Sequence, residues 1–221
     1  MNTGESYDRV AREYADRIFG ELAHKPLDRA LLERLADRVR QLSKGQESGL
    51  VCDLGCGPGH VGRYLSERGK AVVGIDLSPA MVALARELNP GLEFRVGDMR
   101  ALDVPNDAWS GIAAFYSIIH VPRDEVVAVL GELSRVLRPG GWLLLAFHVG
   151  DDVVHQVEWW GQEVNLDFTF FRTSEMEDFL RTAGFVVDES IERPPYPDVE
   201  HQSQRAYVFA HKPEGDRIGP S

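Results

Sequence analysis

Hydrophobic positions in the first part of the chain recur at the spacing of α-helices. Behind Ser6, a possible helix cap, the residues Tyr7, Val10, Tyr14, Ile18 and Phe19 follow this spacing. A second helix is predicted after Pro26, with Leu27, Leu31, Leu35, Val39 and Leu42 on one face. A polar break at residues 43–49 follows. We therefore expect an N-terminal helical cap over residues 1–45.

After this break, short apolar runs alternate with helical segments. The runs that read as strands are residues 50–54, 71–75, 92–96, 112–116 and 142–147. The helical segments between them are residues 60–67, 79–88 and 124–137. Strands that alternate with helices form βαβ units, so this pattern predicts an α/β fold with a doubly wound, mainly parallel sheet.

The C-terminal part of the chain has a different pattern. A helix is predicted over residues 174–182, and two strand-like runs, 185–191 and 206–211, follow it without a helix between them. Two such runs favour antiparallel pairing at the sheet edge, which brings the expected sheet to seven strands. We expect residues 213–221 to be disordered. Because no repeat or low-complexity linker interrupts the chain, we expect residues 1–221 to form a single domain.

Composition narrows the choice of function. The 35 acidic residues outnumber the 24 basic ones, for a net charge of -11, which argues against nucleic acid and against anionic membranes as partners. Residues 1–12 lack the apolar region of a signal peptide, and no apolar stretch reaches the about 20 residues of a membrane span. We expect a cytoplasmic protein in which Cys52 and Cys56 are reduced, buried thiols rather than zinc ligands.

A glycine-rich turn at residues 53–59, Asp-Leu-Gly-Cys-Gly-Pro-Gly, ends one strand and opens a helix. Glycines allow a tight turn and close approach to a ligand, and the helix start offers free N–H groups. A dinucleotide fingerprint requires a third glycine, but this chain has His60 there. Asp53, just before the first glycine, suits a ligand with a positive charge and would repel a pyrophosphate.

This turn resembles motif I of the class I S-adenosylmethionine (SAM)-dependent methyltransferases, and the resemblance extends over residues 5–212. Residues 74–78, 97–99 and 138–141 are similar to later motifs of that family, in the same order. Residues 7–14 resemble the aromatic N-terminal segment that closes over SAM in many small-molecule members. One departure is Ser110-Gly111, where many relatives carry Phe-Asp before the fourth strand.

The resemblance implies SAM as cofactor and S-adenosylhomocysteine as product. Asp76 corresponds to the acidic residue that accepts both ribose hydroxyls, and Asp98 belongs to the turn beside adenine. Packing or capping alone is the alternative for the tyrosines, Leu77, Met81 and Asp98. The implied cofactor-binding residues are Tyr7, Tyr14, Asp53, Gly55, Cys56, Gly57, Gly59, Asp76, Leu77, Met81, Asp98, Met99, Tyr116 and Ser117.

The resemblance further implies in-line transfer of a methyl group to a nucleophilic atom. The enzyme mainly aligns the two reactants and excludes water, and a general base is optional. His120 and His148 follow the fourth and fifth strands, whose carboxyl ends border the ligand crevice in such sheets. Both are candidates for a base or a hydrogen-bonding group, with a packing role as the alternative. His155 and His201 are expected to be solvated loop residues.

The segment 149–173 is rich in aromatic residues and is expected to form a lid over the site. Trp159, Trp160 and Phe170 suit an apolar or aromatic small-molecule acceptor, and a small core beneath the lid is the alternative. Asp151 and Asp152 with His148 have no diagnostic metal spacing, so we expect no metal.

Two other functions share part of this pattern. A SAM-binding protein without methyl transfer has the same cofactor motif, and only turnover separates it from an enzyme. A nicotinamide-dependent oxidoreductase requires the third glycine at position 60 and does not readily accept Asp53. Methylation of protein or nucleic acid is disfavoured by the acidic balance of the chain and by a compact lid.

Overall fold

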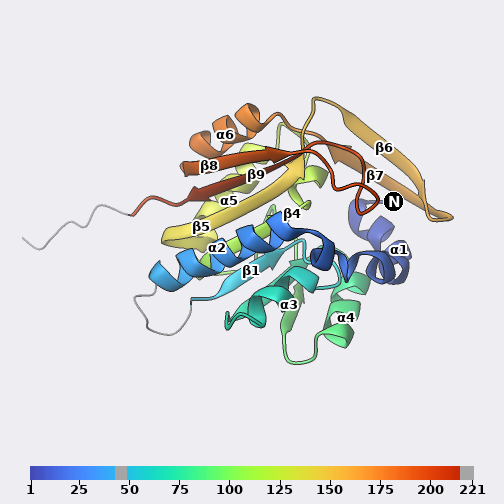
Figure 1. The fold of residues 1–221 in the computed structure, drawn as a ribbon, viewed down its shortest axis with the longest axis horizontal. Coiled ribbons are helices and arrows are strands. Elements are labelled where there is room, and N and C mark those ends of the chain that lie inside the picture. The colour runs from blue at the N-terminus through green and yellow to red at the C-terminus, as the bar shows by residue number, and fades with distance from the viewer. Residues whose placement is uncertain (43–48, 215–221) are drawn as a thin grey trace, which may run out of the picture.

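The computed structural model describes residues 1–42 and 49–214, so most of the predicted polar break and of the predicted disordered tail lies outside the described residues. The main sheet has the strand order β3-β2-β1-β4-β5-β9-β8 (Figure 1). Its strands are β1 (Val51–Leu54), β2 (Val72–Asp76), β3 (Glu93–Val96), β4 (Trp109–Phe115), β5 (Leu137–His148), β8 (Val186–Arg193) and β9 (Arg205–His211). The helices are α1 (Thr3–Ile18), α2 (Pro26–Leu42), α3 (His60–Ser66), α4 (Pro79–Leu88), α5 (Val126–Val136) and α6 (Thr173–Thr182).

Strand pairing confirms the doubly wound, mainly parallel, seven-stranded sheet. β1 pairs in parallel with β2 and β4, β2 with β3, and β4 with β5. β9 pairs antiparallel with both β5 and β8, so the antiparallel strand of this sheet edge lies between two others. The parallel strands therefore end along one common edge of the sheet.

Helices cover both faces of the sheet, and α2 and α3 lie in front of the strands in Figure 1. On that face Leu32 and Leu35 of α2 and Leu65 of α3 pack in one buried cluster. On the opposite face Leu130 of α5 and Met176 of α6 belong to another. None of the described helices is both long and apolar enough to span a membrane.

Two local features differ from the sequence-based expectation. Helix α1 begins at Thr3 because Asn2 caps it, in a reciprocal pair with Glu5; Ser6, the predicted cap, lies inside the helix. The Ser6 hydroxyl instead accepts a hydrogen bond from the N–H of Asn165 at 2.9 Å. The helical pattern of apolar residues starts only at Tyr7, so it placed the cap at Ser6, one turn too late. The spacing of Asn2 and Glu5 is the signal that would have given the correct cap.

The departure at Ser110-Gly111 has a packing reason. A Cβ at Gly111 would lie 2.8 Å from Cγ2 of Val39, so glycine allows α2 to approach β4 closely. β4 and β5 also begin earlier than predicted, at Trp109 and Leu137, which face each other in the parallel ladder.

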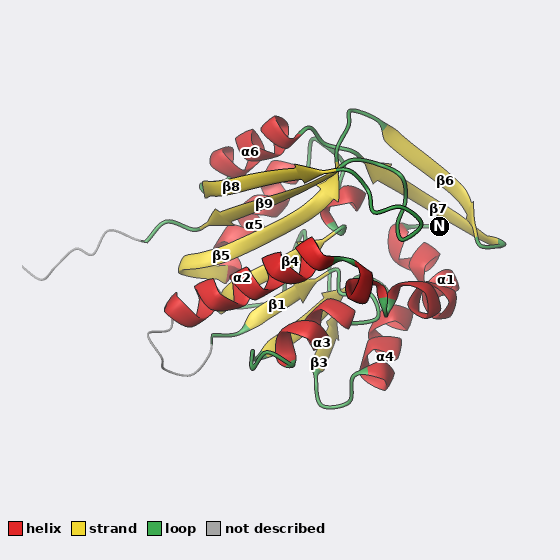
Figure 2. Cartoon of the chain, viewed as in Figure 1, coloured by secondary structure: helices red, strands yellow, loops and turns green. Residues whose placement is uncertain are grey.

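The segment predicted as a lid forms a β-hairpin of its own, β6 (Val153–Trp159) and β7 (Gln162–Thr169). The φ angles of Trp160 and Gly161, +53° and +78°, make the tight turn between the two strands. Figure 2 shows the hairpin standing apart from the main sheet, next to α1. It is joined to α1 through the bond between Asn165 and Ser6.

Candidate active site

Two cavities open near the carboxyl ends of the parallel strands and share the lining residues Tyr7, Tyr14 and Tyr116. The first, about 90 Å³, lies beside the glycine-rich turn and the end of β2. The second, about 400 Å³, is bordered by the β6–β7 hairpin. The three tyrosines therefore stand where two ligands can meet.

The glycine-rich turn is hydrogen-bonded to β2, the next strand along the chain. The N–H of Gly55 donates to the carbonyl of Ile75 at 2.7 Å, and the φ of Gly55 is +71°. A Cβ at Gly55 would lie 2.2 Å from Cβ of Ser117, whose hydroxyl donates to the carbonyl of Leu54 at 2.8 Å. Only glycine fits this position. Ser117 stabilises the turn by packing against Gly55 and by its bond to Leu54.

Three residues of the glycine-rich turn do not line the first cavity, and their contacts support the local fold. Asp53 is buried, and its Oδ2 accepts the N–H of Gly62 at 2.7 Å, which supports the start of α3. Burial raises the pKa of Asp53 to about 6. Asp53 also lines a third, smaller cavity together with Gly55 and Gly57, and its role toward a positively charged ligand stays a prediction. Cys56 packs in a core cluster, and Gly59 caps α3 with a left-handed backbone.

Asp76 at the end of β2 lines the first cavity and is held in place by backbone donors. Its Oδ2 accepts the N–H of Gly57 at 2.8 Å, and its Oδ1 accepts the N–H of Ser78 at 2.9 Å. Burial raises the pKa of this carboxyl group. Each carboxylate oxygen has a second lone pair, so the fixed carboxylate fits a pair of ribose hydroxyls.

The rest of the first cavity combines apolar side chains with one further carboxylate. Met81 is buried, whereas Leu77 is 37% exposed. Asp98 accepts the N–H of Arg100 at 2.9 Å and so stabilises its own turn. The predicted residues that line this cavity are Tyr7, Tyr14, Gly55, Gly57, Asp76, Leu77, Met81, Asp98, Met99, Tyr116, Ser117 and His120.

His120 bridges α1 and the hairpin. Its Nδ1 lies 2.9 Å from the carbonyl oxygen of Asp167, which only accepts, so Nδ1 carries the proton. The other nitrogen, Nε2, therefore accepts a hydrogen bond from the Tyr7 hydroxyl at 2.8 Å. Burial lowers the pKa of His120 to about 4, and the ring is neutral near pH 7.

His148 ends β5 and lines the second cavity. Its Nδ1 lies 2.8 Å from the hydroxyl of Ser203, and its ring stacks on Phe170 at 5.0 Å between centroids. Burial and the nearby charge of Arg205 lower its pKa to about 3. The two histidine candidates thus belong to different walls of the site.

Aromatic rings form the outer wall of the second cavity. The ring of Trp159 forms T-shaped contacts with the rings of Tyr7 and Tyr14, with centroids 6.0 and 5.8 Å apart. Phe170 lines the same cavity. Trp160 stacks on Trp159 at 4.5 Å but lies outside the cavity lining and beneath the guanidinium of Arg17.

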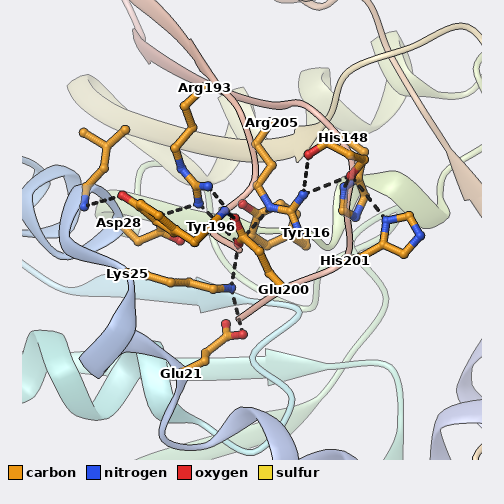
Figure 3. A network of polar contacts seen from close by, with 12 residues as sticks. Glu21, Lys25, Asp28, Tyr116, His148, Arg193, Tyr196, Glu200, His201 and Arg205 are labelled. Carbon is orange, nitrogen blue, oxygen red and sulfur yellow. Dashed lines mark hydrogen bonds and ion pairs between the residues drawn. The ribbon is translucent and has the colours of Figure 1, made fainter. Parts of the chain in front are cut away.

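The second cavity is also lined by charged residues that the sequence did not indicate, and Figure 3 shows them within one network of polar contacts. Glu21, Lys25, Glu200 and Arg205 line it, although they come from the two ends of the chain. His201 lines the cavity as well, and it is an exposed loop residue, as expected. The sequence contains one weak signal for two of these residues. Lys25 comes directly before a predicted helix and Arg205 directly before an apolar strand, where side chains are often buried.

The residues that we considered for a metal do not gather around one point. Asp151 forms an ion pair with Arg172 at 3.1 Å. Within residues 1–42 and 49–214, no three His, Cys, Asp or Glu side chains are placed to hold a metal ion.

Residues 51–141 match the model of a family described as a methyltransferase domain. The chain is 35% identical over 140 residues to a malonyl-[acyl-carrier protein] O-methyltransferase of Salmonella typhimurium, covering 60% of this chain and 53% of the relative. It is 33% identical over 156 residues to a phosphatidylethanolamine N-methyltransferase of Cereibacter sphaeroides, covering 66% and 70%. The chain spans about half the length of the first curated relatives that it matches.

The fold also matches solved structures. One is a Burkholderia thailandensis 1,6-didemethyltoxoflavin-N1-methyltransferase with 1,6-didemethyltoxoflavin and S-adenosylhomocysteine bound. It has a TM-score of 0.62 and 20% identity, and the match covers 97% of this chain and 92% of that one. Together with the sequence matches, this places the chain among the class I SAM-dependent methyltransferases.

Proposed function

We propose that this protein transfers the methyl group of SAM to an O, N or C atom of a small, apolar or aromatic metabolite, and so leaves S-adenosylhomocysteine. The observation that carries the proposal is the second cavity. Its volume of about 400 Å³ is within the usual range for small-molecule sites, and it shares Tyr7, Tyr14 and Tyr116 with the first cavity.

The first cavity is the proposed cofactor site. Asp76 would accept the ribose hydroxyls, and Leu77 and Met99 would flank the adenine. SAM supplies an electrophilic sulfonium methyl group, and the protein must align an acceptor with it and keep water away. The tyrosines at the junction of the two cavities are positioned for this alignment.

Neither histidine is required as a general base in this proposal. His120 is already engaged by Tyr7 and Asp167, so we assign it the role of holding Tyr7. His148 borders the acceptor cavity with a pKa near 3, which makes it a hydrogen-bonding group and a weak base. An acceptor whose nucleophilic atom ionises readily needs no stronger base.

The size of the cavity favours a free small molecule over a macromolecule. The Burkholderia neighbour is described with a small heteroaromatic compound, whereas the curated relatives named above act on a carrier-bound acyl group and on a phospholipid. The net charge of -11 supports an acceptor other than nucleic acid or an anionic membrane surface. The proposed location is the cytoplasm, in keeping with the two free cysteines.

The test is to incubate the protein with SAM and a panel of small aromatic phenols, amines and acids. Turnover is measured by the release of S-adenosylhomocysteine and by mass spectrometry of the acceptor. We expect a mass increase of one methylene on at least one acceptor. Trp159→Leu should raise the acceptor KM. Trp142→Leu serves as the matched control, because Trp142 lies in the first half of β5 and lines neither cavity. SAM binding without methylation of any acceptor would support a SAM-binding protein instead and overturn the proposal.

A further inference from the structure

The hydrogen-bonding role of His148 in the second cavity depends on which of its ring nitrogens carries the proton. A neutral imidazole donates from one nitrogen and accepts at the other. Burial and the charge of Arg205 lower the pKa of His148 to about 3, so the ring is uncharged near neutral pH. The contacts of its two nitrogens therefore decide whether the cavity is offered a proton or a lone pair.

The hydroxyl of Ser203 is the partner of Nδ1 of His148, at 2.8 Å. Nη1 of Arg205 lies 2.9 Å from the same hydroxyl oxygen. Because a guanidinium group only donates, this contact occupies a lone pair of the oxygen and leaves the hydroxyl proton available. The proton of Ser203 can therefore point at Nδ1 of His148.

His201 is a competing partner of the Ser203 hydroxyl. Its Nδ1 lies 3.4 Å from the oxygen, whereas Nδ1 of His148 lies 2.8 Å away. The shorter separation is that of a strong hydrogen bond, and the longer one is at the limit of such contacts. His201 is also exposed, so water can serve as its partner. The Ser203 proton therefore goes to His148.

The charge of Arg205 favours the same arrangement. His148 and Arg205 lie opposite each other in the β5–β9 ladder, and both are labelled in Figure 3. The ion pair of Arg205 with Glu200, at 2.9 Å, keeps the guanidinium group in place. Since Arg205 donates to the partner of Nδ1, a lone pair on Nδ1 faces the cation favourably, whereas an N–H there would be repelled.

Nε2 of His148 therefore carries the proton. Within residues 1–42 and 49–214 it has no hydrogen-bond partner, and protein atoms do not enclose it. The rings of Tyr116 and Phe170 pack against the imidazole, with centroids 5.2 and 5.0 Å away, and both line the second cavity together with His148. An N–H group is thus available to a ligand in this cavity.

From these contacts we infer that the methyl acceptor carries a carbonyl oxygen, which accepts a hydrogen bond from Nε2 of His148, with Ser203 as the positioning residue that fixes the proton on that nitrogen. This inference rests on the proposed function and specifies the class of its substrate. A carbonyl oxygen accepts without bringing a further donor into the cavity. A hydroxyl group in its place would need a second partner for its own proton.

The charges around the cavity favour a neutral oxygen over an anion. The cations at this end are already paired, Lys25 with Glu21, Arg193 with Asp28 and Arg205 with Glu200. An anionic ligand would lose its hydration there without gaining an unpaired cation. The donor of His148 is neutral, so it matches an uncharged carbonyl group.

The donor role of His148 also separates the binding group from the reacting atom. A protonated Nε2 has no lone pair, so it does not take a proton from the methyl acceptor. An N–H bonded to the nucleophilic atom would draw electrons away from it. The methylated atom is therefore a different one from the carbonyl oxygen, and it lies nearer Tyr116, which lines both cavities.

Nitrogen NMR of the full chain with isotope-labelled histidines tests the proton position without any ligand. The signals of His148 are those that disappear in His148→Phe, and we expect the proton on Nε2 near neutral pH. Ser203→Ala should populate the form with the proton on Nδ1, whereas the matched control Ser190→Ala should not, because Ser190 bonds Glu177 outside the cavity. A proton on Nδ1 in the unchanged chain, or an unchanged spectrum in Ser203→Ala, overturns the inference.

Binding of two ligands of the same shape tests the carbonyl group. Acetophenone and isopropenylbenzene differ in one oxygen, and titration of the chain saturated with S-adenosylhomocysteine measures both affinities. His148→Phe keeps a ring against Phe170 and removes the N–H. It should weaken acetophenone about 5-fold, the scale of one neutral hydrogen bond, and leave isopropenylbenzene unchanged. His211→Phe is the matched control, at the other end of β9 and outside both cavities. Circular dichroism establishes that each variant is folded.

The outcomes separate this inference from the proposed function. Absence of acetophenone binding, or an equal effect of His148→Phe on the two ligands, overturns the carbonyl site even if other aromatic compounds are methylated. A selective loss of acetophenone affinity, with no compound methylated, supports the site and overturns the methyl transfer instead.

Discussion

The hydroxyl of Tyr7 donates a hydrogen bond to Nε2 of His120 at 2.8 Å, while Nδ1 of the same ring donates to the carbonyl of Asp167 at 2.9 Å. Helix α1, the turn after β4 and the β6–β7 hairpin are thereby joined through one imidazole. Because Tyr7 lines both cavities, this chain of bonds holds its oxygen where the two ligands are expected to meet.

Replacing Tyr7 by Phe removes this link with little change of shape. We expect kcat/KM to fall about 10-fold, on the scale of one hydrogen bond, because the ring is no longer held against His120. Steady-state kinetics measures the effect. The control is Tyr64→Phe, which removes the exposed bond of Tyr64 to Glu33. Equal rates for the two variants would show that the link to His120 has no role in turnover.

Much of the fold could be predicted from the chain. Apolar runs and glycine turns alternate with helical segments in residues 50–147, and such a pattern has few stable arrangements besides a doubly wound sheet. The motif residues Gly57, Asp76 and Met99 line one cavity because parallel strands end at a common edge.

The remaining parts of the site depend on long-range packing. Asp53 points to the N–H of Gly62 because alternate residues of a strand face opposite sides, which the motif alone does not reveal. Lys25 and Arg205 converge only when β9 inserts beside β5. No local periodicity of the sequence encodes that contact.

Asp76→Ala should weaken S-adenosylhomocysteine binding by about 10- to 100-fold, since hydrogen bonds to a charged group contribute about 1.5–3 kcal/mol. It also frees the N–H of Gly57, which Asp76 holds in the turn. Calorimetric titration measures the loss. Asp178→Ala, on the exposed side of α6, should leave the affinity unchanged. A dissociation constant that is the same in the two variants would refute the ribose role.

Gly55→Ala tests the close approach of the turn to Ser117. The added Cβ meets Ser117 at 2.2 Å, so we expect a loss of about 2–4 kcal/mol in the free energy of unfolding and a loss of cofactor binding. Gly69→Ala is matched, because Gly69 has a φ of +75° and open space around it. It should cost only about 1 kcal/mol, from the backbone alone. Urea denaturation compares the two, and equal losses would mean that contact with Ser117 is unimportant.

His120 should make the protein sensitive to acid. Its pKa in the folded state is about 4, below the ordinary value of 6.5, so the unfolded chain binds the proton first as the pH falls. The free energy of unfolding should therefore decrease between about pH 6.5 and pH 4. In His120→Gln the decrease between pH 7 and 5 should be smaller by about 2 kcal/mol. Parallel urea titrations at both pH values test this, and an unchanged difference would mean that His120 titrates normally.

The most direct test of the account is a crystal structure with S-adenosylhomocysteine bound. We expect the ribose hydroxyls on Asp76, the adenine beside Met99, and the sulfur at the junction formed by Tyr7, Tyr14 and Tyr116, facing the second cavity. A ligand that binds elsewhere, or whose sulfur points away from the second cavity, would contradict the arrangement of cofactor and acceptor sites described above.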